Sequence, residues 1–246
     1  MIMQNHLLNN TDIESFFATR GHESMQTVDY GNSHPHLATF TNGKLEDVSP
    51  VKDPNQILET AMISSVSKQR ETETQDLWQG NTFCDMPVHY KARDLGKDRL
   101  FQAAFLYHLY PREEVVLIDA GTFLTIDFIN EQGFQGGFIF QGIKTFLASY
   151  KAAARLPDLS QKPFTLDLPN SLPSSTEEAI TGASAHYIQG IFQSLAPSLL
   201  KNKKIILTGG ESTYLEAILN NSLTVPHLIH YSLYFLKQEM QLRRLS

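Results

Sequence analysis

One short pattern occurs twice in the chain, each time directly after a strand-like run. The first copy is Asp29-Tyr30-Gly31-Asn32-Ser33, and the second is Asp119-Ala120-Gly121-Thr122. An aspartate at the end of a strand can hold a hydrated Mg²⁺, and a glycine lets the turn bring backbone N–H groups and a hydroxyl against phosphate oxygens. One such turn alone is ordinary turn chemistry. Two of them in matching positions predict a phosphate clamp built from two similar halves.

The segments around both turns repeat the same order of strands and turns. Strands are expected at 27–29, 36–40 and 44–48, and again at 115–119, 123–129 and 138–140. Asn42-Gly43 lies between two of these runs and is a strong hairpin signal. We therefore expect a duplicated α/β fold with mixed sheets around a cleft. Its parts are an N-terminal extension at 1–24, a first half at 25–113 and a second half at 114–246.

Helices and two further buried strands complete the predicted halves. Helices are expected at 55–60, at 69–79, between Gly96 and Pro111, at 142–154, from Ser175 onward and at 229–243, and buried strands at 61–66 and 204–208. Ser175 and Glu178 form a capping box, and the helix after Gly96 reads as amphipathic. The stretch around 13–19 is either a short helix or part of a disordered extension.

Composition and charge argue against several classes of function. The 246 residues carry 20 basic and 26 acidic side chains, which give a formal charge of −6. There is no basic stripe of the kind that follows a nucleic-acid backbone. No apolar run suits a signal-peptide core or a membrane span, and the single Cys84 cannot form an internal disulfide. We expect a cytoplasmic protein that contacts neither nucleic acid nor membrane.

The two turns carry the candidate nucleotide site. The residues expected to contact the phosphates are Asp29, Gly31, Asn32, Ser33, Gly121 and Thr122. Asp29 and Asp119 would hold Mg²⁺ directly or through water. Thr125 and Asp127 alternate onto one face of the strand after the second turn, so they could serve a cation or a phosphate together.

A second cluster, Gly96-Lys97-Asp98-Arg99, lies at the start of a predicted helix, where backbone N–H groups favour an anion. Asp98 could take a hydroxyl proton while Arg99 holds a substrate carboxylate in a bidentate pair. By itself the cluster favours an exposed ion pair that opens a helix.

Two glycine-rich turns complete the set of motifs. The run from Gly136 to Gly142 could offer backbone carbonyls to a monovalent cation, and Gly209-Gly210 could form a flat platform for a nucleoside. Each is also compatible with a plain tight turn.

Taken in order, these motifs resemble those of one family. The shared motifs are Asp29-x-Gly-Asn-Ser, Ile63-Ser-Ser-Val, Leu95-Gly-x-Asp-Arg, Asp119-x-Gly-Thr-x-x-Thr-x-Asp, Gly136-Gly-x-Ile-x-x-Gly, Ser175-Thr-Glu-Glu-Ala-Ile and Thr208-Gly-Gly. The set is similar to that of type III pantothenate kinases, also described as Baf-like, from about Val28 to the C-terminus. The resemblance implies a duplicated actin-like, ribonuclease H-like ATPase fold. It also implies ATP-dependent phosphorylation of pantothenate to 4′-phosphopantothenate, the first step of coenzyme A biosynthesis.

The resemblance assigns roles to individual residues. Asp98 would be the general base, and pantothenate would be bound by Tyr90, Gly96, Lys97, Arg99 and Thr176. Gly209 and Gly210 would lie at the ATP site, and Asp127 would be the ligand of a monovalent cation, K⁺ or NH₄⁺. The family resemblance further implies Mg²⁺ and a homodimer with sites near the interface.

The chain departs from the family pattern after the first turn. Where the family usually has a basic residue, this sequence has His34-Pro35-His36, and Gln141 replaces a usual proline. An imidazole carries less positive charge near neutral pH than a lysine or an arginine, and Pro35 lacks a backbone donor. Two alternatives therefore stay open. One is a catalytically weak nucleotide-binding regulatory protein of the same fold, and the other is a kinase for another hydroxylated small molecule.

Overall fold

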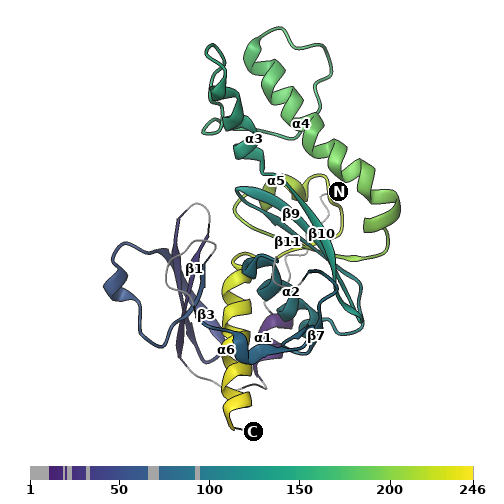
Figure 1. Cartoon of the computed structure of the whole chain (residues 1–246). Coiled ribbons are helices and arrows are strands. Elements are labelled where there is room, and N and C mark those ends of the chain that lie inside the picture. The colour runs from purple at the N-terminus through teal and green to yellow at the C-terminus, as the bar shows by residue number, and fades with distance from the viewer. Residues whose placement is uncertain are drawn as a thin grey trace. The chain divides into compact units, whose positions relative to one another are not determined.

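The computed structural model describes residues 11–18, 20, 24–31, 34–65, 72–91 and 95–245 (Figure 1). The chain divides into two compact units. The central unit comprises Val116–Ile126 and Gly137–Pro226. The terminal unit comprises the described residues of Leu7–Val115, Asp127–Gly136 and His227–Ser246. These units follow a different division from the linear one at 113/114, because the last helix of the chain belongs with the first strands. The linear domain boundaries remain a prediction.

Two mixed sheets repeat one strand order. The first sheet has the order β3-β2-β1-β4 and contains β1 (Met25–Tyr30), β2 (His36–Thr41), β3 (Lys44–Pro50) and β4 (Met62–Ser65). The second has the order β10-β9-β8-β11-β12 and contains β8 (Val115–Ala120), β9 (Phe123–Asn130), β10 (Gly133–Gln141), β11 (Lys204–Thr208) and β12 (Ser222–Thr224). In both, the third, second, first and fourth strands are neighbours in that order. This duplicated topology confirms the predicted actin-like fold.

Local sequence explains the meander that opens the first sheet. Strands β1, β2 and β3 are antiparallel neighbours, and β4 runs parallel to β1. The β2–β3 turn has positive φ at both Asn42 (+52°) and Gly43 (+78°), the backbone that a two-residue hairpin needs. All four residues of β4 are buried, as predicted for this strand.

In the central unit, helices follow the glycine-rich turn and the proline-rich connection. They are α3 (Ile143–Ser149), the 3₁₀ turn η4 (Tyr150–Ala152), α4 (Thr176–Leu195), the π-helical turn η5 (Ala196–Leu200) and α5 (Ser212–Glu216). The capping box is present, because the Glu178 amide donates to Ser175 Oγ at 3.2 Å. The Glu178 carboxylate accepts from the amide and hydroxyl of Ser174 at 2.7 and 2.9 Å. The sequence predicts an apolar face for this helix at Ile180, Ala183, Tyr187, Ile188 and Ile191; Ile180, Ile188 and Ile191 are buried, but Ala183 is exposed.

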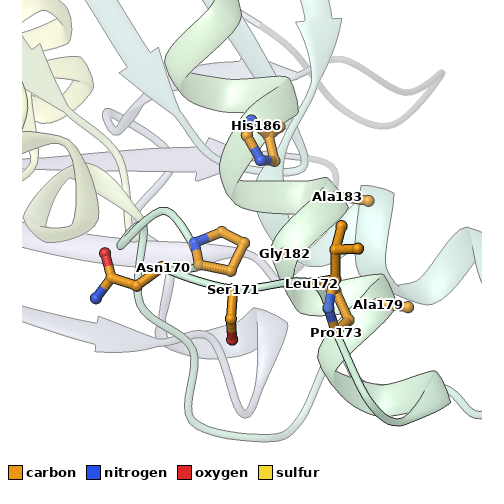
Figure 2. A pocket seen from close by; sticks show the side chains of 9 residues that line it. Asn170, Ser171, Leu172, Pro173, Ala179, Gly182, Ala183 and His186 are labelled. Carbon is orange, nitrogen blue, oxygen red and sulfur yellow. The ribbon is translucent and has the colours of Figure 1, made fainter.

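The proline-rich connection packs on α4 and leaves a pocket of about 410 Å³ between them (Figure 2). It is lined by Pro169, Asn170, Ser171, Leu172, Pro173, Ala179, Gly182, Ala183 and His186. A Cβ on Gly182 would lie 3.3 Å from Pro169 Cγ, so a side chain there would crowd the connection. None of the predicted catalytic or binding residues lines this pocket.

The terminal unit contains three helices, α1 (Thr11–Ala18), α2 (Lys97–Leu109) and α6 (Leu228–Leu245), among its described residues; α2 and α6 pack on the first sheet, and α1 packs on α2 and α6. Helix α6, yellow in Figure 1, packs against both β1 and α2. Helix α1 adds Phe17, which stacks on Phe105 at 5.6 Å and meets the Tyr234 ring edge-on at 5.0 Å. The helical alternative for the N-terminal stretch is therefore confirmed, and α1 is part of the core.

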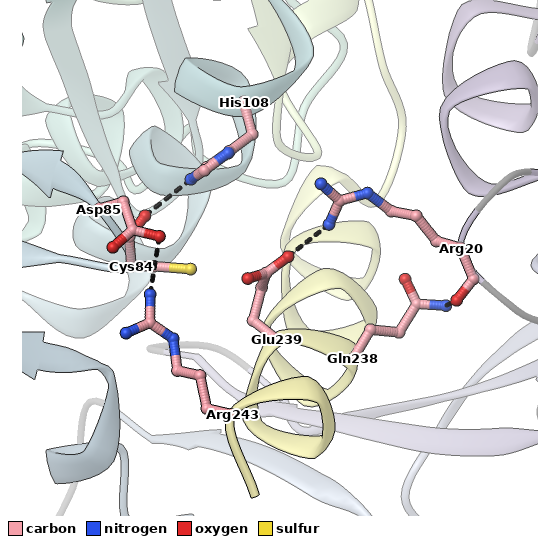
Figure 3. Close-up of polar contacts among 7 residues, drawn as sticks. All are labelled: Arg20, Cys84, Asp85, His108, Gln238, Glu239 and Arg243. Carbon is pink, nitrogen blue, oxygen red and sulfur yellow. Dashed lines mark hydrogen bonds and ion pairs between the residues drawn. The ribbon is translucent and has the colours of Figure 1, made fainter. Parts of the chain in front are cut away.

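A polar cluster links Arg20, just after α1, to helices α2 and α6 and to the turn at Cys84-Asp85 (Figure 3). Arg20 forms an ion pair with Glu239, and Arg243 forms one with Asp85 at 2.8 Å. His108 Nε2 donates to the Cys84 carbonyl at 2.7 Å. Burial raises the pKa of the Cys84 thiol to about 12, so this cysteine is a poor nucleophile.

Two predicted helices were wrong in the residues that the structure describes. The stretch at 55–60 contains only the end of a 3₁₀ turn, η1 (Pro54–Gln56), which Asp53 caps. The stretch at 69–79 is replaced in part by η2 (Gln75–Leu77) and the meander of β5 (Trp78–Gln79), β6 (Thr82–Phe83) and β7 (Met86–Pro87); residues 66–71 lie outside the described residues. Trp78 packs on Phe83 at 5.1 Å across this meander, a tertiary contact that outweighs weak helix propensity.

Helix α2 is correctly placed but not amphipathic. Every residue from Arg99 to Leu106 is buried, because α6, α1 and the sheet surround this segment. A helix buried on all sides can still carry a polar residue if that residue has a buried partner. Among the described helices, none is long and apolar enough to cross a membrane.

Candidate functional site

The predicted acceptor residues gather at the start of α2 in the terminal unit. Gly96 is the N-cap, and its carbonyl accepts from the Leu100 amide at 3.0 Å. A Cβ on Gly96 would lie only 2.7 Å from Oδ1 of Asp98, so the Asp98 carboxylate folds back over a position that has room for it only because it is glycine. Asp98 is half-buried in the first turn of the helix. A carboxylate there is favoured by the helix dipole.

Arg99 is fixed by a buried carboxylate 28 residues further along the chain. Its Nε donates to both carboxylate oxygens of Asp127 at 3.1 Å, and its Nη2 donates to Oδ1. Arg99 is 6% exposed and Asp127 is fully buried. Burial by itself lowers the Arg99 pKa, but the hydrogen bond and charge of Asp127 outweigh it, so the Arg99 pKa is raised. The guanidinium therefore stays charged and has one orientation.

Tyr90 and Phe134 continue this group on the side of β10. The Arg99 Cζ atom lies 5.9 Å from the centre of the Phe134 ring. The Tyr90 ring meets Phe134 edge-on, with centres 6.1 Å apart and planes at 75°. Tyr90 is 40% exposed, whereas Phe134 is fully buried. The predicted contacts Tyr90, Asp98 and Arg99 thus belong to one cluster.

Backbone contacts hold the Tyr90 segment against the start of β10. The His89 amide donates to the Phe134 carbonyl at 3.1 Å, and Val88 forms a parallel bridge with Phe134. Gly133 has φ +97°, and a Cβ there would lie 2.0 Å from the Pro87 carbonyl oxygen. Any larger residue at Gly133 would push the two segments apart.

In the central unit, two glycines pack against the second phosphate turn. A Cβ on Gly142 would lie 1.9 Å from the Gly121 carbonyl oxygen. Gly209 has φ +87°, and a Cβ there would lie 2.4 Å from the Ala120 carbonyl oxygen and 2.5 Å from Asp119 Oδ1. The structure therefore brings the Asp119 turn together with Gly142 and Gly209. The predicted glycine-rich turn is shorter than expected, because strand β10 continues to Gln141.

Sequence reasoning missed Glu211, which joins these turns. Its carboxylate accepts from the amides of Ile143 at 2.9 Å and Lys144 at 3.3 Å, and its own amide donates to the Ala120 carbonyl at 2.8 Å. The Glu211 pKa is raised overall, because the effect of burial exceeds the lowering effect of the two amide hydrogen bonds. Its place directly after Gly209-Gly210 was the one available signal.

The first phosphate turn lies at the end of β1. In the strand register, Asp29 lies opposite His36 of β2 on one side and opposite Ser64 of β4 on the other. A Cβ on Gly31 would lie 3.2 Å from Asp29 Oδ2, so the carboxylate reaches over the glycine. Asn32 and Ser33 lie outside the described residues.

His227, just before α6, and His230, in its first turn, interact electrostatically with His36, which the sequence did not reveal. His230 is buried, and its Nδ1 lies 2.8 Å from Thr27 Oγ1. Burial lowers its pKa to about 3, with smaller effects from His227 and His36. Burial and His36 also lower the His227 pKa. His227 and His230 are therefore poor substitutes for a basic side chain beside the first turn.

The structure has no ready-made metal site within its described residues. No group of three or more histidine, cysteine or acidic side chains there could hold a metal ion. Asp29 and Asp119 belong to different units, so their joint Mg²⁺ site stays a prediction. Carboxylate oxygens suit Mg²⁺ in kind. The three contacts from Arg99 take most of the roughly four lone-pair positions on the Asp127 carboxylate, which leaves little room for a cation.

Comparison with known proteins identifies the family. The family model for type III pantothenate kinase matches residues 54–196, more than half of the chain. A type III pantothenate kinase of Porphyromonas gingivalis is 30% identical over 82% of this chain and 93% of its own length. One from Campylobacter hominis is 25% identical over 85% of this chain and 96% of its own.

Solved structures support the fold. A Baf family protein from Campylobacter jejuni matches with a TM-score of 0.61 at 20% identity, over 88% of this chain and 99% of its own. A protein from Sinorhizobium meliloti described as a 2-dehydro-3-deoxygalactonokinase matches with a TM-score of 0.54 at 12% identity, over 88% and 99%. The family model, the relatives of similar length and the shared motif order agree, and the chain belongs to the type III pantothenate kinase family.

Proposed function

We propose that this pantothenate kinase transfers the terminal phosphoryl group of ATP to a hydroxyl of pantothenate, with Asp98 as the general base and Arg99 as the anchor of the pantothenate carboxylate. The observation that carries the proposal is the pair at the start of α2. Asp98 is half-buried at the helix N-terminus, and the next residue is held by the buried Asp127. A guanidinium that is already fixed binds a carboxylate with little further loss of freedom, which favours an aligned acceptor.

The remaining acceptor contacts follow from this placement. Tyr90, which is partly exposed, packs edge-on with the buried Phe134, and Gly96 and Lys97 lie at the start of the helix that would face the acceptor. Thr176, the first residue of α4, belongs to the central unit. We propose Thr176 as a further pantothenate contact. We also propose that the protein is a homodimer with its sites near the interface.

The two Asp-Gly turns would hold ATP. Asn32, Ser33 and Thr122 would donate to phosphate oxygens, and Gly209 and Gly210 would lie against the nucleoside. Asp29 and Asp119 would hold Mg²⁺, which neutralises charge on the β- and γ-phosphates when it is bound. A monovalent cation, K⁺ or NH₄⁺, would use the remaining lone pair of Asp127 with backbone carbonyls. A cytoplasmic location remains a proposal from the sequence.

A coupled ADP-release assay tests the reaction. With saturating ATP, Mg²⁺ and K⁺, ADP release should depend on pantothenate, and Asp98→Asn should abolish it while the thermal midpoint stays close to that of the wild type. Turnover that persists in Asp98→Asn removes this residue from the role of base. If ADP release does not depend on pantothenate but does depend on another hydroxylated acid or sugar, the acceptor is wrong.

One observation favours a second candidate, a nucleotide-binding regulatory protein with weak catalysis. Where the family usually has a basic side chain after the first turn, this chain places His36 beside His227 and His230, whose pKa values burial lowers. ATP binding without turnover, with turnover gained in His36→Lys, would select this candidate.

A further inference from the structure

Phe134 lies at the centre of the acceptor cluster and has no assigned role. It is the second residue of β10, is fully buried, and contacts Arg99 with its ring face and Tyr90 at 6.1 Å. We infer that Phe134 is a positioning residue for pantothenate binding, acting through Arg99 and Tyr90 together. This inference rests on the proposed acceptor site.

Two groups act on the guanidinium of Arg99. Asp127 accepts from Nε and Nη2, which orients the fork. The Phe134 ring lies 5.9 Å from Cζ and attracts the cation through its negative face. Phe134 therefore adds an attraction that the hydrogen bonds to Asp127 do not supply.

Tyr90 depends on the same residue through side chain and backbone. Its ring edge rests on Phe134, and the His89 amide, one residue earlier, donates to the Phe134 carbonyl. The close contact of Gly133 with Pro87 keeps these two segments in register. A shift of Phe134 should therefore move two predicted pantothenate contacts, Arg99 and Tyr90.

The plainer reading is that Phe134 only fills the core. Under that reading, replacing it lowers stability but leaves the affinity for pantothenate unchanged. Phe83 offers a matched comparison in the same unit. It is also fully buried and packs between Trp78 at 5.1 Å and Phe101 at 5.7 Å, and neither of these rings belongs to a predicted acceptor residue.

Steady-state kinetics of full-length Phe134→Leu, Phe134→Tyr and Phe83→Leu test the inference. We expect Phe134→Leu to raise the KM for pantothenate about three- to tenfold, from loss of the cation–π contact and of the support for Tyr90, with the KM for ATP within about twofold. Phe134→Tyr keeps the aromatic face and should stay within about twofold for both substrates. Phe83→Leu should lower the thermal midpoint without changing the KM for pantothenate.

Two results overturn the inference alone. One is a KM for pantothenate within about twofold of the wild type in a folded Phe134→Leu enzyme, and the other is an equal rise in Phe83→Leu. A wild-type enzyme without pantothenate-dependent turnover overturns the proposed function, and the inference falls with it.

Discussion

The Arg99–Asp127 pair allows a quantitative prediction about stability. Asp127 is fully buried and Arg99 is 6% exposed, so removal of the carboxylate leaves a desolvated guanidinium without its main partner. Breaking one side of a buried pair costs about 3–5 kcal/mol. We therefore expect Asp127→Ala to lower the free energy of unfolding of the terminal unit by about 3–5 kcal/mol, a large fraction of the roughly 5–15 kcal/mol typical of whole proteins.

Removing both charges should be milder. The double variant Arg99→Met with Asp127→Leu replaces the pair by apolar groups of similar size, so no buried charge is left unpaired. We expect it to recover more than half of the loss caused by Asp127→Ala. Asp85→Asn is the matched control within the terminal unit, because it breaks an ion pair with Arg243 in which the Asp85 side chain is 61% exposed. Its effect should be close to the error of measurement.

Urea unfolding followed by tryptophan fluorescence measures this change. Trp78 is the single tryptophan of the chain and belongs to the terminal unit, as do Arg99 and Asp127. At a slope of about 2–3 kcal/mol per molar urea, the predicted loss moves the midpoint by roughly 1–2.5 M. A loss below about 1 kcal/mol for Asp127→Ala, or a double variant less stable than Asp127→Ala, would refute the argument that the two charges are desolvated together.

Three further predictions concern other parts of the molecule. Gly209→Ala should raise the KM for ATP or lower the thermal midpoint, because its Cβ would meet Asp119 and Ala120, whereas Gly190→Ala on α4, with open space around it, should stabilise slightly. Phe17→Ala should cost about 3–5 kcal/mol in urea unfolding, since the ring is 1% exposed; a loss below 1 kcal/mol would show that α1 is dispensable. His230 has a pKa of about 3 in the folded protein, so the unfolded state binds more protons between that value and about 6.5. Stability should therefore fall with decreasing pH by up to about 1.4 kcal/mol per pH unit from this group, and His230→Asn should flatten the dependence of the urea midpoint between pH 7 and 5.

Features set by neighbouring residues were predictable from the sequence. The Asn42-Gly43 hairpin and the Ser175–Glu178 capping box depend on local backbone chemistry, and both are present. The strand-turn-strand order around Asp29 and Asp119 follows from hydrophobic runs and glycines, and it identified the duplicated fold. The start of α2 at Lys97 was found for the same reason.

Features set by distant partners were not predictable. The role of Asp127 as the partner of Arg99 needs a contact across 28 residues, and that of His230 beside Thr27 needs one across 203. Glu211 is visible in the sequence only as a residue after two glycines, yet it holds the first amides of α3. The meander at Trp78 replaced a helix because a ring contact across a turn decided between two weak local preferences.

The pairing of α1 with α6 has a consequence for folding kinetics. Arg20 and Glu239 form an ion pair across 219 residues, and Phe17 of α1 meets the Tyr234 ring of α6 edge-on. The core of the terminal unit therefore depends on contacts between segments that are far apart in sequence. Contacts of such long sequence separation slow folding and leave apolar surface open until both segments meet. We expect the encounter of α1 with α6 to be a late step in folding of this unit.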